Sequence, residues 1–175
     1  MKNKQNTRRG FTLMELLVVL VIVIILTTAA WHSYAKVQEK ARISEILVLL
    51  KPIAVAQRLY YQTHDNWATS FDDLDINMLL PPDTNGTFGG KTYHNITDTR
   101  SNKFWSLQLE GSKVFATRLG GDYQGGGLEM VLGEVPQMYC IEKLYSVSQN
   151  KYCAKFFKGT DKRQAADYWR YTIEQ

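Results

Sequence analysis

A run of 21 residues, Phe11–Trp31, constrains this chain most, because Glu15 is its only ionisable group. At ~1.5 Å per residue, a helix of this length spans about 31 Å, which matches the hydrocarbon core of a bilayer. The positive charges that precede the run are Lys2, Lys4, Arg8 and Arg9. The positive-inside rule keeps such a segment in the cytoplasm. We therefore expect a membrane-spanning helix over residues 11–31, with the rest of the chain on the far side.

The apolar run differs from a cleaved secretory signal, which has a shorter apolar core followed by a small-residue cleavage site. Ala29 and Ala30 are small, but Trp31 and His32 follow them. Glu15 is costly there, by about 2.5–3.5 kcal/mol for a carboxylate in an apolar span. It can reach the headgroups at the cytoplasmic end, or pair with a positive group inside a helix assembly. Spacing alone favours neither role.

The distribution of charge argues against nucleic acid as a partner. The formal net charge is +4, but from Phe11 onward 17 Lys or Arg balance 17 Asp or Glu, so the excess belongs to residues 1–10. A chain that binds polyanions through its bulk charge carries a surplus throughout. A DNA-uptake or adhesion receptor displayed on a fibre would need an exposed basic or aromatic patch, and the neutral charge disfavours it.

Residues 8–20, RRGFTLMELLVVL, resemble the processing and assembly signature of type IV pilins and type II secretion pseudopilins. The resemblance implies that a prepilin peptidase cuts after Gly10 and that the new N-terminal residue, Phe11, is methylated. It also implies that Glu15 is the assembly glutamate. The ammonium group left on Phe11 would then pair with Glu15 of a neighbouring subunit, and this pair would fix the axial register of the helices. Removing one partner of such a buried pair leaves the other charge uncompensated, which is destabilising.

The helix is expected to continue from residue 32 to residue 61 as an amphipathic segment. Residues 33–61 contain no glycine, and apolar residues recur at helical spacing. This stripe comprises Ile43, Ile46, Leu47, Leu50 and Ala54. Pro52 should bend the helix, because it removes a backbone donor. Many members of the resembled family carry another proline where this chain has His32, so the chain departs from the pattern there.

Residues 62–175 are predicted to form a globular periplasmic or extracellular domain. Residues 62–91 read as loop, with a helical turn near residues 71–74 and aromatic residues that pack in the core. Strands are expected over residues 103–109, 113–119, 128–132 and 168–173, the first two joined by a turn at 110–112. Three or four antiparallel strands packed on the Ile43 stripe give an α+β fold, which agrees with the pilin-like fold that the resemblance implies.

Cys140 and Cys153 are the two cysteines of the chain. In a reducing compartment they would be separate thiols, whereas outside the inner membrane they could close a loop of ~14 residues. The resemblance favours the disulfide, because many pilins close a C-terminal loop in this way.

Catalytic and metal-binding patterns are weak. The glycine-rich segment 120–127 lacks the Gly-Lys-Ser/Thr of a phosphate-binding loop and is expected to be a flexible inter-strand loop. His32, His64 and His94 have no companion ligands at metal spacing, and calcium binding near Asp122 lacks dense ligands. Asn85 and Asn95 fit a glycosylation pattern that is common by chance. We expect no enzyme, no cofactor and no metal.

The sequence thus predicts a structural subunit of a type IV pilus-like filament, with a type II secretion pseudopilin as the alternative. Its expected partners are copies of itself or related pilins, the prepilin peptidase and methyltransferase, the inner-membrane assembly platform and the membrane. No nucleic-acid partner is expected. Before assembly the chain should cross the inner membrane once with a cytoplasmic N-terminus, and afterwards lie in a pilus or periplasmic pseudopilus.

Overall fold

A computed structural model describes residues 11–76, 80–83, 87–88, 91–92, 99–144, 151–165 and 167–173. The chain divides into two compact units, residues 1–41 and residues 42–175. Gly10, Asn85, His94 and Asn95, which the sequence singled out, lie outside the described residues.

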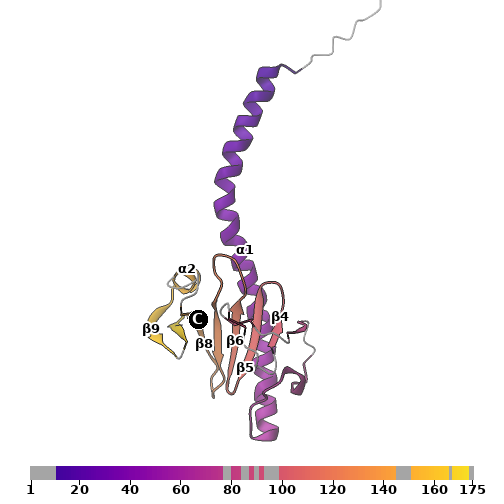
Figure 1. The fold of residues 1–175 in the computed structure, drawn as a ribbon, viewed down its shortest axis with the longest axis vertical. Helices are drawn as coiled ribbons and strands as arrows, with labels where there is room; N and C mark the ends of the chain where they lie inside the picture. Colours follow the sequence, from indigo (N-terminus) through magenta and orange to yellow (C-terminus); the bar gives the residue numbers. More distant parts are fainter. Residues whose placement is uncertain are drawn as a thin grey trace, which may run out of the picture. The chain divides into compact units, whose positions relative to one another are not determined.

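Helix α1 (Leu13–His64) begins in the first unit and ends in the second (Figure 1). Its 52 residues contain no glycine and one proline, Pro52. The predicted helix over residues 11–61 is therefore confirmed within a few residues. The helix continues through Pro52, and the bend expected there stays a prediction. After His64 the backbone turns left-handed at Asp65 (φ 52°), whose N–H donates to the Tyr61 carbonyl at 2.9 Å.

Within the residues that the structure describes, no helix combines the length and the apolar content needed to cross a membrane. The membrane span expected over residues 11–31 stays a prediction.

The second unit is built on an eight-stranded antiparallel sheet with the order β1-β4-β5-β6-β7-β8-β10-β9. The strands are β1 (Pro82–Asp83), β4 (Thr99–Ser101), β5 (Trp105–Glu110), β6 (Lys113–Arg118), β7 (Gly126–Val131), β8 (Gln137–Lys143), β9 (Thr160–Gln164) and β10 (Tyr168–Thr172). Strands β2 (Thr87–Phe88) and β3 (Lys91–Thr92) pair separately, and the short helix α2 (Tyr152–Phe157) precedes β9.

The core lies between the second half of α1 and one face of the sheet. Ile46, Leu50 and Ile53 of the helix and Leu107 and Leu128 of the strands are each at most 1% exposed. The predicted stripe at Ile43 is therefore the packing face of the helix, and the α+β, pilin-like fold is confirmed.

The segment after α1 is anchored to the helix by one side chain. The buried amide of Gln57 donates to the Ala68 carbonyl at 2.8 Å and accepts from the Ala68 N–H at 3.1 Å. The 3-10 helix η1 (Phe71–Asp73) follows, capped by Ser70, and Phe71 is buried as predicted. Asp72 forms an ion pair with Arg100 of β4, which holds this segment beside that strand.

The predicted strands correspond to β5, β6, β7 and β10, and Gly111 (φ 52°) makes the β5–β6 turn. The sheet is wider than the three or four strands expected. Residues 62–91 are not all loop, because Pro82–Asp83 pair with β4 at Arg100 and Thr99. Proline is tolerated there because β1 is an edge strand, where its missing N–H faces no neighbour.

The expectation of a flexible glycine-rich loop over residues 120–127 is wrong for its last two residues. Gly126 and Gly127 are buried in β7. A Cβ on Gly127 would lie 2.0 Å from the Ala116 carbonyl oxygen, and one on Gly126 would lie 2.6 Å from the Tyr152 ring. These glycines are there because a neighbouring backbone and a ring leave no space for a side chain.

Candidate functional site

The start of α1 is built around Thr12. The Glu15 N–H donates to the Thr12 hydroxyl at 3.3 Å and to the Thr12 carbonyl at 3.1 Å. Thr12 is therefore the N-cap, and Glu15 is the third helical residue, as in the capping pattern Thr-x-x-Glu. A carboxylate in the first turn also interacts favourably with the helix dipole. Glu15 thus helps to stabilise the start of its own helix, and this role is separate from the predicted pairing between subunits.

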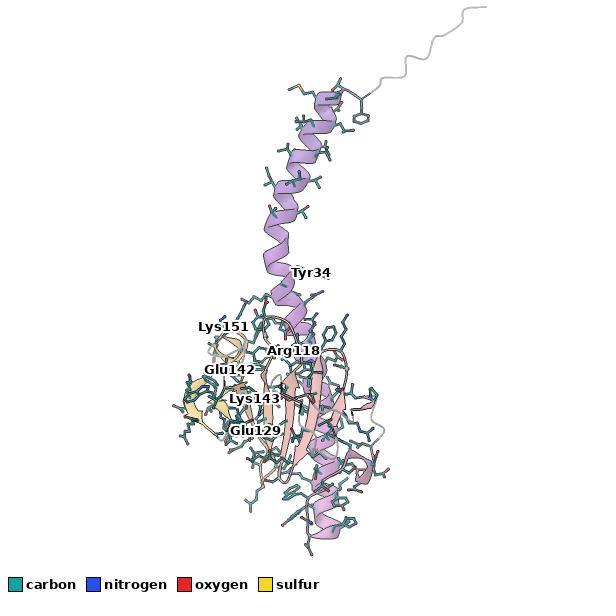
Figure 2. The ribbon with its side chains drawn as sticks, viewed as in Figure 1. Tyr34, Arg118, Glu129, Glu142, Lys143 and Lys151 are labelled. Atoms are coloured by element: carbon teal, nitrogen blue, oxygen red, sulfur yellow. A yellow bond between two sulfur atoms is a disulfide. The ribbon has the colours of Figure 1, made fainter. Side chains whose placement is uncertain are left out.

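The first half of α1 presents an apolar surface on all sides, drawn as sticks in Figure 2. From Phe11 to Thr28 every residue is exposed, and the large apolar side chains range from 46% exposure at Val18 to 85% at Leu13. Two polar side chains within it are satisfied by the helix itself, because the Thr27 and Thr28 hydroxyls donate to carbonyls at 2.7 and 2.8 Å. A helix that is apolar all round requires a covering environment.

Phe11 itself is 82% exposed, and nothing in the described residues packs over it. Phe11 and Glu15 both lie at the N-terminal end of the described apolar surface, within one turn of the helix start. Within the described residues, a positive group of a second molecule can therefore approach Glu15 without displacing a packed side chain.

The disulfide joins Cys140 of β8 to Cys153 of α2, and both residues are fully buried. Beside it lies Glu142, labelled in Figure 2, whose carboxylate accepts from the Cys153 N–H at 2.8 Å and from the Tyr171 hydroxyl at 3.2 Å. Burial and the charge of Glu142 raise the pKa of Tyr171. The predicted disulfide is confirmed, and Glu142 is the polar group that fixes α2 against β8 and β10.

The opposite face of the sheet carries a second buried carboxylate, Glu129 of β7. Arg170 donates to it through Nε at 2.6 Å and through a second nitrogen, and the Tyr168 hydroxyl donates at 3.1 Å. Burial, then the charge of Glu129, raises the pKa of Tyr168 to about 12. The Lys113 ammonium lies 3.8 Å from the same carboxylate. This network is structural, because its acid is fully enclosed by its partners.

Among the described residues, no three His, Cys, Asp or Glu side chains gather closely enough to hold a metal ion.

The chain was compared with known families and proteins, and one family motif and three relatives match it. The prokaryotic N-terminal methylation motif matches residues 5–31. The type IV major pilin protein PilE1 of Neisseria gonorrhoeae is 37% identical over 131 residues, which is 73% of this chain and 70% of that relative. The chain belongs to the type IV pilin family. Another PilE1 sequence is 37% identical over 75 residues, 43% of this chain and 44% of that relative. The fimbrial protein of Neisseria meningitidis serogroup A / serotype 4A is 35% identical over 63 residues, 36% of this chain and 37% of that relative. No solved structure matches the pilin.

The site residues predicted for this pilin fall into three places. Phe11 and Glu15 share the exposed start of α1, Cys140 and Cys153 form the disulfide of the second unit, and Pro52 is exposed on α1. Cleavage at Gly10, methylation of Phe11 and assembly through Glu15 stay predictions.

Sequence reasoning missed Thr12, Glu129 and Glu142. The Thr-x-x-Glu pattern at residues 12–15 is a capping signature and could have identified Thr12. The two glutamates gave no such signal, because a charged residue in a strand normally indicates a solvent-facing position.

Proposed function

We propose that this pilin is a structural subunit of a type IV pilus and that it assembles through the first half of α1. The exposed apolar surface of residues 11–26 carries the proposal. An apolar patch this large on a soluble monomer marks an association surface. Packing these helices side by side in a filament would remove the surface from water. Membership of the pilin family supports this use, and it gives no support to an enzymatic role.

The assembly step rests on two charges. Cleavage after Gly10 would leave an ammonium group on Phe11, which the subsequent methylation would keep positively charged, close to the exposed carboxylate of Glu15. The two would form an ion pair between neighbouring subunits as the helices stagger. In an apolar bundle either charge alone is costly, so the pair selects one axial register. The partners proposed for these steps are the prepilin peptidase and methyltransferase, the inner-membrane assembly platform and other copies of the chain.

The proposed route starts in the inner membrane, with residues 1–10 in the cytoplasm and residues 32–175 on the far side. The basic residues 2–9 support this orientation. A disulfide in the second unit agrees with a compartment outside the cytoplasm.

N-terminal sequencing of the mature protein tests the processing step. The expected first residue is a methylated Phe11. A mature chain that starts at Met1, or after Ala30, would remove the basis for the ion pair.

Glu15→Gln tests the assembly step, because glutamine keeps the capping pattern and removes only the charge. We expect membrane insertion at wild-type level and no fibres in electron micrographs. Thr12→Ala is the matched control, since it loses the cap and keeps the charge. Normal fibres from Glu15→Gln, or an equal loss of fibres from Thr12→Ala, would reject the ion pair.

The alternative is a type II secretion pseudopilin, which builds a short periplasmic filament by the same chemistry. The identity to a type IV major pilin over 70% of that relative favours the pilus. If labelling detects this chain in fibres on the cell surface, the result supports the pilus. If no surface fibres are found and deletion of the chain causes a secretion defect, the result supports the pseudopilus.

A further inference from the structure

Two neighbouring clefts lie on the face of the sheet that points away from the core, where β8, β10 and β9 pair (Figure 1). Cys140 and Tyr171 belong to the core, and successive residues of a strand point to opposite faces. Tyr139, Arg170 and Thr172 therefore point away from the core. The first cleft has a volume of about 300 Å³ and the second of about 450 Å³. Both volumes are of the size of ligand sites, which measure roughly 300–1,000 Å³.

Two arginines form the border between the clefts. Arg163 and Arg170 line both of them, and they lie directly opposite each other on β9 and β10. Like charges in this position destabilise a sheet unless they are compensated. Arg170 is compensated, because it donates to the buried Glu129. Arg163 is exposed and makes no ion pair within the described residues, so an uncompensated guanidinium stands at the border.

The charges around the arginines favour a single carboxylate as the bound anion. A guanidinium group matches a carboxylate with two parallel hydrogen bonds. Acidic side chains line both clefts, since Asp161 lies in the second and Glu110 and Asp167 lie in the first. These acids would repel a chain of closely spaced phosphates or sulfates, but they can accept hydrogen bonds from hydroxyl groups. The clefts therefore suit a ligand that carries one carboxylate with hydroxyl groups on both sides of it.

Uncharged side chains in the clefts can also recognise a sugar. Gln164 lines the first cleft, and Gln137 and Thr172 line the second. All three are exposed, and each can donate as well as accept a hydrogen bond. Tyr139 and Ile173 add apolar surface to the second cleft, which suits the C–H face of a sugar ring.

We propose that the two clefts bind an acidic polysaccharide, with the carboxylate of one uronate unit held by Arg163 and Arg170. The neighbouring sugar units would occupy the clefts on either side. Because the clefts extend in both directions from the arginines, the bound unit is internal to its chain. A sialic acid carries its carboxylate at the end of a glycan and would fill only one cleft. The inference goes beyond the proposed function, since the whole site lies within one chain and requires no fibre.

Arg163→Gln tests the site without disturbing the fold, because Arg163 has no ion pair in the described part of the chain. The measurement is calorimetric binding of a galacturonate oligomer to the full-length chain in detergent. Wild type should bind the oligomer, and Arg163→Gln should bind it at least about tenfold more weakly, because hydrogen bonds to a charged group are lost. Lys158→Gln is the matched control and should bind like wild type. It removes an exposed positive charge nearby, and Lys158 is not among the described residues that line either cleft.

Three further ligands test the chemistry of the bound group with the wild-type chain. The methyl ester of the same oligomer has no charge and should not bind. Sialyllactose, with a terminal carboxylate, should bind at least about tenfold more weakly than the oligomer. Duplex DNA should not compete with the oligomer, because the acids of both clefts repel a dense polyanion.

Absence of binding by wild type, or equal binding by wild type and Arg163→Gln, would overturn the proposal. Equal affinity for sialyllactose would reject the internal unit, and effective competition by DNA would show a general attraction to anions instead of a sugar site. These outcomes leave the proposed function untouched, because binding is measured on single chains. Loss of fibres in the assembly tests would in turn leave this site untouched.

Discussion

Gly127 shows how a single residue position can be limited by a neighbouring backbone. An added Cβ would meet the Ala116 carbonyl oxygen at 2.0 Å, and that oxygen belongs to the paired strand β6. Gly127→Ala should therefore destabilise the fold by ~2–3 kcal/mol, the upper range for overpacking. Gly120→Ala, where the added atom meets nothing within 4 Å, should change stability by less than about 1 kcal/mol. Denaturant unfolding of both full-length variants measures the difference, and equal stabilities would contradict the steric explanation.

Arg170 and Arg163 lie directly opposite each other on β10 and β9, yet their environments differ. Arg170 is bonded to the buried Glu129, whereas Arg163 is exposed and makes no ion pair in the described part of the chain. Arg170→Met should cost about 3–5 kcal/mol, because Glu129 then stays buried with only the Tyr168 hydroxyl and the more distant Lys113 ammonium as partners. Arg163→Met should cost less than about 0.5 kcal/mol. Thermal unfolding compares the two, and similar losses would argue against the buried pair.

The raised pKa of Tyr168 predicts how the stability of the fold depends on pH. Burial and the nearby Glu129 raise its pKa from the ordinary value of 10 to about 12 in the folded state. The neutral phenol is thus favoured by folding, and its contribution is complete below about pH 10 and lost as pH rises toward about 12. Tyr168→Phe should lose about 1 kcal/mol at about pH 9 and show a shallower decline above pH 10. Tyr61→Phe, which removes the hydroxyl of an exposed tyrosine, is the matched control. Unfolding free energies of the wild type and both variants, measured from about pH 9 to about pH 12, test this prediction.

At the scale of elements, the disulfide ties α2 to the central part of the sheet. Reduction, or Cys140→Ser with Cys153→Ser, should lower the unfolding free energy by about 3 kcal/mol, the chain-entropy value for a loop of this length. The buried Tyr152 and the hydrogen bond from Cys153 to Glu142 should keep α2 in place at low temperature. Unfolding with and without reductant checks the loss, and no change on reduction would mean that these contacts alone hold α2.

Elements with a strong local pattern could be predicted from the sequence, and the others could not. The apolar run and the Ile43 stripe identify α1, and the glycine turn identifies β5 and β6. Strand β9, Thr160–Gln164, has no apolar residue, so it exists only because β10 offers a backbone to pair with. Strand β8 was missed because Glu142 interrupts its apolar pattern, although this glutamate is buried and satisfied. Helix α2 is too short for periodicity to show.

At the scale of the whole molecule, the charge balance gives a prediction for processing. The full chain has an isoelectric point of about 9.0, and its excess charge lies in residues 1–10. If the leader is removed, the remaining chain has equal numbers of acidic and basic residues, and its isoelectric point should fall to near neutrality. Isoelectric focusing of the cellular protein against the uncleaved precursor measures this shift, and identical positions would contradict removal of the leader.

The start of α1 and the cysteine pair were visible in the sequence, and the buried carboxylates of the sheet were not. Phe11 and Glu15 stand in a local signature, so their neighbourhood is visible in the sequence. The burial of Glu129 and Glu142 depends on which strands lie side by side, and that order is a property of the assembled sheet. In the sequence both glutamates look like ordinary surface charges, because their partners Tyr168, Arg170 and Tyr171 all lie on β10.

The strand order also affects how the domain is completed during synthesis and export. Strand β10 lies between β8 and β9, so the last described strand in the sequence fills a position inside the sheet. A chain interrupted before Tyr168 would leave β9 unpaired and the buried Glu129 without Arg170 and Tyr168. Truncated products would therefore be recognisable as unfinished and open to proteolysis. The arrangement thus makes completion of the sheet depend on synthesis of the chain through β10.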